Sequence, residues 1–583
     1  MLKELQQLMK NKNINYYIIP TDDDHQSENV GDYFQARKYF SGFTGSAGTL
    51  LATQDNAYLW TDGRYFIQAA NELYSGIKLM KMNTEGYPSL LEFLSQNLNQ
   101  EDTLAFDGKT MNAKFIYNLL EKIDFDLNMQ CVDLITPIWK DRPAMSCEKA
   151  YLFDKKYQGM DTSEKLKAIR DYMNEHHCDS HLITTLDDIA WIFNIRGHDI
   201  QCTPVVLAYA LITQNDAYLY LQNNAYDQDI ADFLKNQGVT IKEYYDVYED
   251  VKDLQGTVLL DLANTNYELM NLMTCDVTDG VNPSQYLKAI KNNTEIKNTI
   301  NAHIKDGVAV TKFMYWLKNN IGKIDIDELS AADQLLQLRK EQDLFIEPSF
   351  TTISAYEKNA ALMHYHPTQN NYSPLENKGF LLVDSGGQYF DGTTDITRTF
   401  VLGKISDIQR KHFTLVLKGM LNLQRIKFLY GQTGIDLDVL ARAPMWNEGI
   451  DYQCGTGHGV GHLLCVHEGP NEFRPKPRTG VPVVLEEGMI TTDEPGIYLE
   501  GQYGIRLENE LLCQKDIKNE YGQYMSFKCI TLVPLDLDGI DVTMLSYDEK
   551  KALNQYHQEV YETISPYLNN DEKEWLKEYT RSI

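Results

Sequence analysis

The sequence predicts an α/β (α+β) protein in which two similar N-terminal α/β domains precede a larger C-terminal domain. Strand-like apolar runs alternate with amphipathic helical stretches throughout the first half of the chain. A weak repeat at an offset of 160 residues indicates two similar domains, because TQDNAYLW at 53–60 returns as TQNDAYLY at 213–220. A chain of 583 residues is long enough for about two to four domains.

The first domain is expected to alternate strands and helices. Its segments NYYIIPTDD, AGTLLAT and NAYLWTD are typical of strands, and GYPSLLEFLSQNL is typical of a helix. Two proline positions mark domain ends: Arg142-Pro143 interrupts the pattern, and Asn282-Pro283 precedes a long helical stretch. We therefore expect α/β domain I at 1–145, α/β domain II at 146–290 and a third domain at 291–583.

The third domain is expected to open with a long helix over about 293–320, capped by Asn293 or Thr294. A second helix is expected to open at Ser330, with Asp333 completing a capping box. The remaining pattern predicts these elements in chain order: a strand pair at 380–400, helices at about 407–429 and 436–448, and strands around 489–513 and 526–534.

Composition excludes several kinds of partner. The chain has 54 Lys and Arg against 83 Asp and Glu, a formal net charge of -29, which disfavours nucleic acid and anionic membrane surfaces. Its nine cysteines are scattered and form no C-x-x-C pair, which indicates a reducing compartment. No apolar run approaches the roughly 18 residues that a membrane-spanning helix needs. We expect a soluble, cytoplasmic protein with neither a nucleic acid nor a membrane as partner.

Five side chains in the last third of the chain have the spacing of a two-metal hydrolytic site. They form a hard, oxygen-rich set of four carboxylates and one imidazole, which would repel itself in a cleft unless cations neutralised it. The five predicted ligands are Asp384, Asp395, His458, Glu494 and Glu508.

The two aspartates sit where a hairpin can bring them together. Asp384 ends the buried-type strand FLLVD, and Ser385-Gly386-Gly387 can turn the chain back toward Asp395. The sequence does not fix the register of this return. Taken singly, either aspartate could be a turn or cap residue, just as Glu508 could face solvent from an edge strand. The order and the strand and turn contexts of all five favour a site.

His458 stands in a run of glycines that lets backbone approach a crowded centre. A phosphate loop is the rival interpretation of GTGHGVGH. It fails, because the run lacks the Lys-Ser/Thr of a Walker loop and its glycines are not spaced as G-x-G-x-x-G. A lone histidine could also be a satisfied core or surface residue.

The chain resembles the aminopeptidase P group of the pita-bread metallopeptidases, in its three-domain, cytosolic-type branch. The resemblance rests on long motifs in a fixed order over essentially the whole chain: DDDHQSE, FSGFTGSAGT, WTDGRYFIQAA, LDDIAWIFNIRGHDI, AHIKDGVA, PSFTTIS, DGTTDITRTF, GTGHGVG, VHEGP, GMITTDEPG and GIRLENE.

This resemblance implies a C-terminal pita-bread catalytic domain, a homodimer and two divalent metal ions per subunit. Mn²⁺ is the ion that the resemblance favours. Asp384, Asp395 and Glu508 would bind both ions or bridge them, and His458 and Glu494 would complete the shells. The implied activity is aminopeptidase hydrolysis of the bond between an N-terminal residue and a following proline in peptides.

The resemblance also implies residues that read the substrate. His364 and His467 are expected to contact the substrate and its reacting carbonyl, beside the metal histidine His458, and Arg64 of WTDGRY is expected to bind substrate from the first domain. From composition alone, His366 could replace His364, and Arg64 would be a solvated strand residue.

Two ions can hold a shared water as hydroxide against a carbonyl, and Glu494 is our candidate general base for that water. His467 or His364 would stabilise the oxyanion.

Two further interpretations stay open at this point: a prolidase-like enzyme restricted to Xaa-Pro dipeptides, and a non-catalytic pita-bread binding scaffold. Relatives commonly have a histidine immediately before GTGHGVG, where this chain has Cys454, so the preference for side chains around the scissile bond is open. The metal used in the cell is open too, because such a site accepts manganese, cobalt, iron or zinc.

Overall fold

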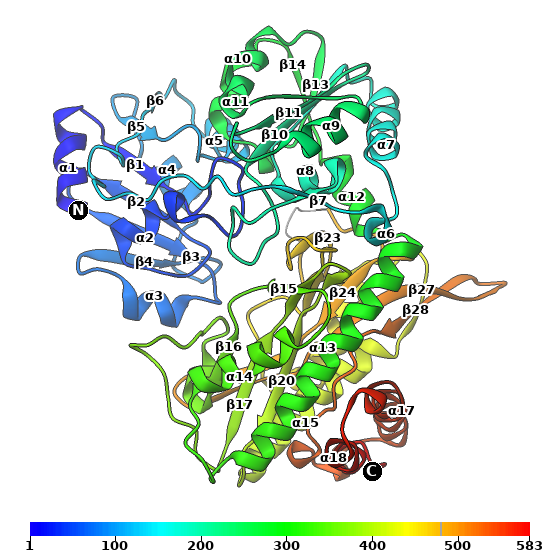
Figure 1. The fold of residues 1–583 in the computed structure, drawn as a ribbon. Coiled ribbons are helices and arrows are strands. Elements are labelled where there is room, and N and C mark those ends of the chain that lie inside the picture. The colour runs from blue at the N-terminus through cyan, green and yellow to red at the C-terminus, as the bar shows by residue number, and fades with distance from the viewer. Residues whose placement is uncertain (478–480) are drawn as a thin grey trace. The chain divides into compact units, whose positions relative to one another are not determined.

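The computed structural model describes residues 1–477 and 481–583 (Figure 1). The chain forms two compact units, the first made of Met1–Asp154 and Met160–Ser284 and the second of Lys155–Gly159 and Gln285–Ile583. Domain boundaries at 145 and 290 stay predictions. Within the described residues, no helix combines the length and the apolar character needed to cross a membrane.

The first unit holds two six-stranded sheets with the same topology. Their strand orders are β4-β3-β2-β1-β5-β6 and β12-β11-β10-β8-β13-β14. Corresponding neighbours have the same direction: the central three strands pair antiparallel, and the outer pairs are parallel. The strands are β1 (Tyr16–Ile19), β2 (Thr49–Thr53), β3 (Ala57–Thr61), β4 (Ile77–Lys81), β5 (Thr103–Phe106) and β6 (Asn128–Cys131), then β8 (Ser180–Ile183), β10 (Ala208–Thr213), β11 (Ala217–Leu221), β12 (Val239–Glu243), β13 (Thr257–Leu260) and β14 (Asp276–Asp279).

Each copy of the sequence repeat forms the same kind of turn between two antiparallel strands. Between β2 and β3, the Asn56 amide donates to the hydroxyl of Thr53 at 2.9 Å. Between β10 and β11, the Asp216 amide donates to the hydroxyl of Thr213, also at 2.9 Å. A threonine hydroxyl that accepts from the backbone closes each turn and sets the strand register. The prediction of two similar α/β domains is confirmed.

Helices cover these two sheets. Several begin at a side-chain cap: Ser89 forms a capping box with Glu92, and Asn112 accepts from the Phe115 amide. The predicted helix in GYPSLLEFLSQNL is α4. The longer helices of the unit are α1 (Leu2–Asn11), α2 (Ala36–Ser41), α3 (Phe66–Glu72), α4 (Leu90–Asn97), α5 (Ala113–Lys122), α7 (Thr162–Glu175), α8 (Leu186–Phe193), α9 (Gln228–Asn236) and α11 (Tyr267–Leu272).

The second unit is built on several smaller sheets and one six-stranded sheet. Its strand orders are β15-β18-β19, β16-β17-β20, β25-β26 and β21-β28-β27-β24-β22-β23. The strands are β15 (Phe345–Pro348), β16 (Ile353–Tyr356), β17 (Phe380–Ser385), β18 (Gly387–Tyr389), β19 (Gly392–Thr393), β20 (Ile396–Val401), β21 (Lys427–Leu429), β22 (Gly457–Gly459), β23 (Glu468–Phe473), β24 (Ile490–Asp493), β25 (Gly496–Leu499), β26 (Tyr503–Arg506), β27 (Asn509–Asn519) and β28 (Gly522–Cys529).

The long helix of this unit was predicted correctly, but its cap was not. Helix α13 runs over Asn293–Asn320 and lies beside α14 (Glu328–Lys340) (Figure 1). Its N-cap is Asn292, whose side chain accepts from the amides of Thr294 and Glu295, rather than Asn293 or Thr294. Asparagine and threonine are both capping residues, so tertiary packing selects which of the three starts the helix.

Two further predicted elements need correction. Helix α14 begins before Ser330: its cap is Asp327, and Ser330 is the third helical residue of the capping box. The predicted helix at 407–429 ends earlier, because α15 spans Asp407–Gln424 and Lys427–Leu429 pairs with β28 as an edge strand. The last turn of an amphipathic pattern does not distinguish a helix from a following short strand. The unit also contains helices α16 (Gly434–Trp446), α17 (Tyr547–Ile564) and α18 (Asn570–Tyr579), and the shorter α6 (Lys155–Gln158) and most of α12 (Pro283–Ala289).

A buried ion pair joins helices α13 and α14. Arg339 of α14 donates from Nε to Asp306 of α13 at 2.7 Å, and both side chains are almost fully buried. Asp306 also accepts from the hydroxyls of Tyr389 and Thr394, each at 2.8 Å. Burial would raise the pKa of Asp306, but the Arg339 charge and these donors hold it below its usual value. The network fixes Thr394, the residue before Asp395.

Candidate metal centre

The structure brings the two predicted aspartates to adjacent strands. Strands β17 and β20 pair antiparallel, with Asp384 opposite Thr397, so Asp395 lies directly before the start of β20. The chain turns back through the small β18–β19 hairpin rather than at Ser385-Gly386-Gly387, because Ser385 still belongs to β17. Both aspartates are buried, at 7% and 3% exposure.

His458 enters the site from β22, where backbone packs against backbone. A Cβ on Gly457 would stand 1.8 Å from the Thr492 carbonyl oxygen, and one on Gly459 would stand 2.4 Å from that of Glu468. Only glycine fits at both positions, so the expected reason for the glycine run is confirmed. The imidazole Nδ1 lies 2.9 Å from the Gly459 carbonyl oxygen, to which it must donate.

Three of the predicted ligands converge. Asp395, His458 and Glu508 each offer an atom within 4.8 Å of the others. His458 Nε2 lies 3.6 Å from Asp395 Oδ2 and 3.3 Å from Glu494 Oε1, so the fourth predicted ligand faces the same imidazole.

Glu508 lies in the short break between β26 and β27, not inside a strand as the pattern suggests. Its amide donates to the Thr397 carbonyl at 3.1 Å, and its Oε2 accepts from the Thr397 hydroxyl at 2.7 Å. These two bonds to one residue of β20 hold the carboxylate against the strand that follows Asp395. The structure places Glu508 at 1% exposure, which excludes the solvent-facing alternative.

Asp384 is joined to the group through Arg506. One oxygen, Oδ2, accepts from Arg506 Nη2. The other, Oδ1, is buried and meets no hydrogen-bond donor among the residues at 1–477 and 481–583. A buried carboxylate oxygen without a donor is costly, and a cation is one group that would satisfy it.

The carboxylates of the cluster are buried and lie close together, and both conditions change their pKa values. Burial, then the charge of Glu508, raises the pKa of Asp395 well above its usual range. Burial, then Glu494 and Asp384, likewise raises the pKa of Glu508. For Glu494 burial acts in the same direction, but the hydrogen bond and charge of His458 outweigh it and lower the pKa. The set needs positive charge, from protons or from metal ions.

These residues fit a divalent cation. Because Nδ1 of His458 donates to a carbonyl, Nε2 is the ring nitrogen that can serve as a ligand, and it faces two carboxylates. Carboxylate oxygens with one imidazole suit manganese and similar hard or borderline ions.

The predicted histidines differ in position. The ring of His467 stands nearly perpendicular to that of His458, with centroids 4.3 Å apart, so the two lie together. His364 is half-buried, whereas its rival His366 is exposed. A further histidine, His462, is buried at 2% exposure and lies 3.0 Å from both the Thr299 hydroxyl and the Tyr157 carbonyl.

Arg64 belongs to the first unit, at the turn after β3. Its Nε and Nη2 atoms donate to the two oxygens of Asp62 at 2.9 and 2.8 Å, and Nη1 lies 3.7 Å from Glu28. This bidentate bond sets the direction of the guanidinium. A role in substrate binding stays a prediction.

Cys454 lies at the end of a buried network. Arg442 donates to its carbonyl oxygen at 2.6 Å, to the Tyr452 carbonyl at 2.8 Å and to Asp438 at 2.6 Å. The thiol side chain packs against the apolar core of the second unit. The backbone before His458 is therefore fixed independently of which side chain stands at 454.

Sequence reasoning missed Arg506, an arginine in direct contact with a predicted ligand. It is 3% exposed and also donates to the Tyr498 hydroxyl at 2.8 Å and the Met363 carbonyl at 3.3 Å. An arginine inside the apolar strand GIRLENELL was the available signal, because a buried charge needs a partner.

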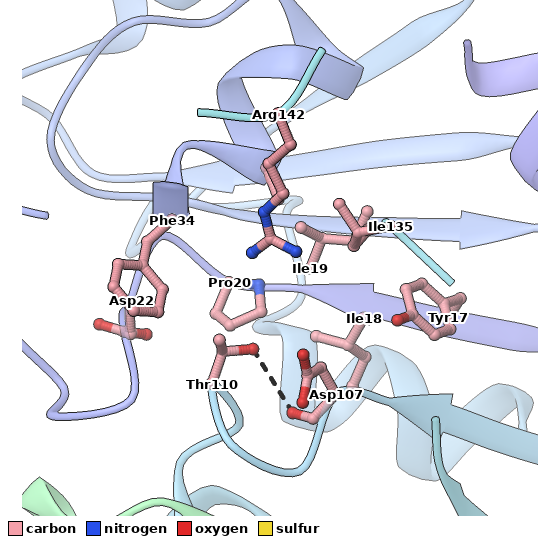
Figure 2. Close-up of a pocket in the computed structure, with 11 residues that line it drawn as sticks. Tyr17, Ile18, Ile19, Pro20, Asp22, Phe34, Asp107, Thr110, Ile135 and Arg142 are labelled. Atoms are coloured by element: carbon pink, nitrogen blue, oxygen red, sulfur yellow. Dashed lines mark hydrogen bonds between the residues drawn. The ribbon is translucent and has the colours of Figure 1, made fainter. Parts of the chain in front are cut away.

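A separate pocket lies in the first unit and contains none of the predicted site residues. Figure 2 shows the Arg142 guanidinium pointing into it beside the carboxyl ends of β1 and β5. Asp22 lines it, and burial, followed by the nearby Asp23, raises the pKa of Asp22 to about 7. The lining residues are Tyr17, Ile18, Ile19, Pro20, Asp22, Phe34, Ala36, Asp107, Thr110, Ile135 and Arg142.

Comparisons with known proteins show the family to which the chain belongs. Residues 297–515 match the metallopeptidase family M24, and residues 523–583 match the C-terminal region of that peptidase family. Residues 1–143 and 141–295 each match the creatinase/prolidase N-terminal domain. Together with the cluster of carboxylates and imidazole, these matches define an M24 metallopeptidase with two creatinase-type N-terminal domains.

Relatives of known name identify the family within this class of metallopeptidases. A protein named "Probable Xaa-Pro aminopeptidase P" from Pyrenophora teres f. teres is 36% identical over 610 residues, covering 99% of this chain and 92% of its own. Another of that name, from Aspergillus niger, is 36% identical over 606 residues, with coverage of 100% and 98%. The chain belongs to the Xaa-Pro aminopeptidase P family of metallopeptidases.

A solved structure supports the same assignment. The X-prolyl aminopeptidase from Caenorhabditis elegans, described as a cytosolic enzyme with a di-nuclear active site, is 33% identical and has a TM-score of 0.93. The match covers 98% of this chain and 95% of that one. The prolidase from Pyrococcus horikoshii, at 24% identity and a TM-score of 0.51, shares the fold over 64% of this chain. The predicted pita-bread fold class is thus confirmed.

Proposed function

We propose that this enzyme removes the N-terminal residue from peptides whose second residue is proline, using two divalent metal ions. The observation that carries the proposal is the convergence of Asp395, His458 and Glu508, with Glu494 facing the same imidazole. The proposed ligands are those two aspartates, one histidine and two glutamates expected from the sequence: Asp384, Asp395, His458, Glu494 and Glu508. Mn²⁺ is the ion we propose first.

When bound, two such ions supply an activated water and polarise the substrate carbonyl. The protein supplies the rest. Asp395 and Glu508 provide charge on adjoining backbone segments, and Thr397 fixes the second of them. Arg506 holds Asp384 through one oxygen, and the other, which meets no donor among the described residues, would be available to a cation.

Proton transfer falls to Glu494 in this proposal. A glutamate side chain is ordinarily ionised near neutral pH, so this carboxylate can accept a proton. The Thr492 hydroxyl donates to Glu494 Oε1 at 3.3 Å, which orients the group. The backbone amide of Glu494 donates to the Thr456 carbonyl at 2.7 Å, and this bond holds Glu494 beside the start of the strand of His458.

Charge on the scissile carbonyl oxygen would be stabilised by an imidazole. His467 lies against His458 and is one candidate donor, and His364 is the other. Arg64, oriented by Asp62, is proposed to bind the substrate. Proline specificity would follow from a site shaped to its ring, because the tertiary amide before proline has no N–H to offer.

The test is hydrolysis of a peptide series by the protein loaded with Mn²⁺. A tripeptide such as Arg-Pro-Pro should release its first residue, and Arg-Ala-Pro should not. Cleavage of Xaa-Pro dipeptides alone would favour the prolidase interpretation. A protein that retains no added metal and cleaves none of the series would be a binding scaffold instead.

Two further features are proposed with the function. The homodimer is an expectation from the family resemblance, and sedimentation of the purified protein tests it. A cytoplasmic location is supported by the cytosolic description of the Caenorhabditis elegans enzyme. Fractionation of cells that produce the protein tests the location.

A further inference from the structure

The segment that carries His364 has little regular structure to hold it. After β16 the chain passes through a short 3₁₀ helix (Glu357–Ala361) and then runs without a helix or extended strand until β17 begins at Phe380. A catalytic side chain on such a segment requires fixed contacts, because an error of about 1 Å in position can cost on the order of 10²-fold in rate.

One buried carboxylate, that of Glu328, accepts hydrogen bonds from several parts of that segment. Glu328 is the first residue of α14 and is 0% exposed. Its Oε1 accepts from the Tyr356 amide at 2.6 Å, and its Oε2 accepts from the Ser373 amide at 2.7 Å. These two bonds hold the entrance and the far end of the segment, because Tyr356 ends β16 and Ser373 follows His364.

The middle of the segment reaches the same carboxylate. The Tyr365 hydroxyl donates to Glu328 Oε2 at 2.8 Å, and Asn359 Nδ2 lies 2.9 Å from Oε1 and 3.2 Å from Oε2. Four donor groups thus converge on one side chain. Among the residues that the structure describes, no salt bridge involves Glu328, so hydrogen bonds alone compensate its burial.

The residue on the other side of His364 is also held. The Met363 carbonyl accepts from Arg506 Nη2 at 3.3 Å, and the same guanidinium contacts Asp384. Tyr365 is 5% exposed and packs in an apolar cluster with Ile353 and Leu382. Both chain neighbours of His364 are therefore fixed, one by Arg506 at the metal site and one by Glu328.

Close backbone packing makes this arrangement specific. A Cβ on Gly504, in the strand of Arg506, would stand 1.8 Å from the Ala360 carbonyl oxygen. The strand that carries Arg506 therefore packs directly against the segment that is hydrogen-bonded to Glu328. At Gly504 a side chain larger than that of glycine would collide with the backbone of this segment.

We propose that Glu328 is a positioning residue that places His364 at the substrate, acting through the Tyr365 hydroxyl. This inference rests on the proposed function, because it assumes that His364 takes part in the reaction. The hydrogen bonds of Glu328 described above go to the segment and not to a predicted ligand. We expect its effect on turnover to pass through the position of His364, and unchanged bound manganese would show that the pairing of β16 with the strand of Asp384 is not disturbed.

The experiment is a double-mutant cycle measured with Mn²⁺-loaded enzyme on Arg-Pro-Pro. Tyr365→Phe removes one hydroxyl and keeps the packed ring, and it should lower kcat/KM about 10-fold or more. In the His364→Ala background, the same substitution should change kcat/KM less than about 2-fold, because the group that it positions is gone. Glu328→Gln should behave in the same way, since its amide cannot accept from all four donors.

Controls separate positioning from general damage. Tyr372→Phe alters an exposed tyrosine of the same segment and should leave kcat/KM unchanged. Bound manganese in Tyr365→Phe should match that of the wild type. The melting temperature of Tyr365→Phe should fall, because Glu328 loses one of its four donors, but it should stay well above the assay temperature, so that the variant is compared as a folded enzyme. If Glu328→Gln does not fold, Tyr365→Phe still decides the question.

The outcomes distinguish the two proposals. Equal losses from Tyr365→Phe in the wild-type and His364→Ala backgrounds would overturn the positioning role while the peptidase function stands. Full activity of His364→Ala would remove His364 from the reaction and overturn the inference with it. A wild-type enzyme inactive on every Xaa-Pro peptide would overturn the proposed function itself.

Discussion

His458 Nε2 faces Asp395 Oδ2 at 3.6 Å while Nδ1 of the same ring is committed to the Gly459 carbonyl. The ring is thereby oriented by its own backbone, before any ligand binds. Its Nε2 atom points at crowded carboxylates, and the nearby Asp384 is bonded to Arg506. Such a preformed but self-repelling site links metal binding to stability.

This link predicts the behaviour of Asp395→Asn. In the wild type, Mn²⁺ should raise the melting temperature and a chelator should lower it, because the ions neutralise crowded carboxylates. The variant should show no activity and a much smaller manganese shift. Without metal it should be at least as stable as the wild type, since one buried carboxylate is gone. Differential scanning fluorimetry with and without Mn²⁺ measures this, and a variant that melts well below chelated wild type would contradict it.

Glu494→Gln tests proton transfer. The amide keeps the shape of the side chain and one oxygen, but it cannot accept the proton, so kcat should fall about 10²- to 10⁴-fold. KM should change little if substrate binding depends on other groups. Steady-state kinetics at fixed Mn²⁺ saturation give both values. A fall in kcat that excess Mn²⁺ restores would assign Glu494 to metal binding alone.

His467→Ala and His462→Gln form a matched pair. The ring of His467 lies against that of His458, whereas His462 is hydrogen-bonded to Thr299 and Tyr157. Loss of His467 should lower kcat about 10²-fold at unchanged metal content. His462→Gln should lower the melting temperature more than the turnover. The prediction fails if the two variants lose activity equally.

Much of this site could be predicted from the sequence, because each ligand stands in a local context with its own physical reason. FLLVD requires a buried strand, and the glycines around His458 require close backbone. The register between Asp384 and Asp395 could not be predicted, since it depends on the small β18–β19 hairpin. Pairing in a sheet is set by long-range contacts that a pattern does not record.

The residues that hold the site segments in place were still harder to predict from the sequence. Arg506 and Glu328 act on segments far from them in sequence, and no periodicity connects an acceptor with four donors spread over Tyr356–Ser373. The start of α14 illustrates the limit. Asp327 and Ser330 can each begin a helix, and placing the start at Ser330 puts Glu328 outside the helix that presents it.

Arg64→Met tests whether the first unit contributes to substrate binding. If Arg64 binds peptide, KM for tripeptides should rise, on the order of 10-fold for the loss of a charge-assisted contact, with a smaller change in kcat. Arg64→Lys should recover only part of this loss, because lysine lacks the fork that Asp62 orients. Arg170→Met, in the same unit, is the control and should leave KM unchanged. Equal KM in wild type and Arg64→Met would remove Arg64 from the site.

A last prediction concerns acid stability and His557, which is not among the predicted site residues. Burial, reinforced by Arg398 and Arg581, lowers the pKa of this histidine to about 3, against about 6.5 in an unfolded chain. Since the unfolded state binds the proton first, the contribution of His557 to stability is complete above pH 6.5 and is lost as the pH falls toward 3. Each pH unit in that window costs about 1.4 kcal/mol.

The substitution His557→Gln keeps an acceptor for the Leu535 amide, which donates to His557 Nε2 at 3.1 Å, and it removes the titration. The variant should therefore be somewhat less stable than wild type at pH 7.5, but the difference should shrink or reverse at pH 5. Melting temperatures of both proteins at the two pH values, each with chelator present so that metal occupancy is equal, measure this. A stability difference that is the same at both pH values would show that His557 does not titrate on unfolding.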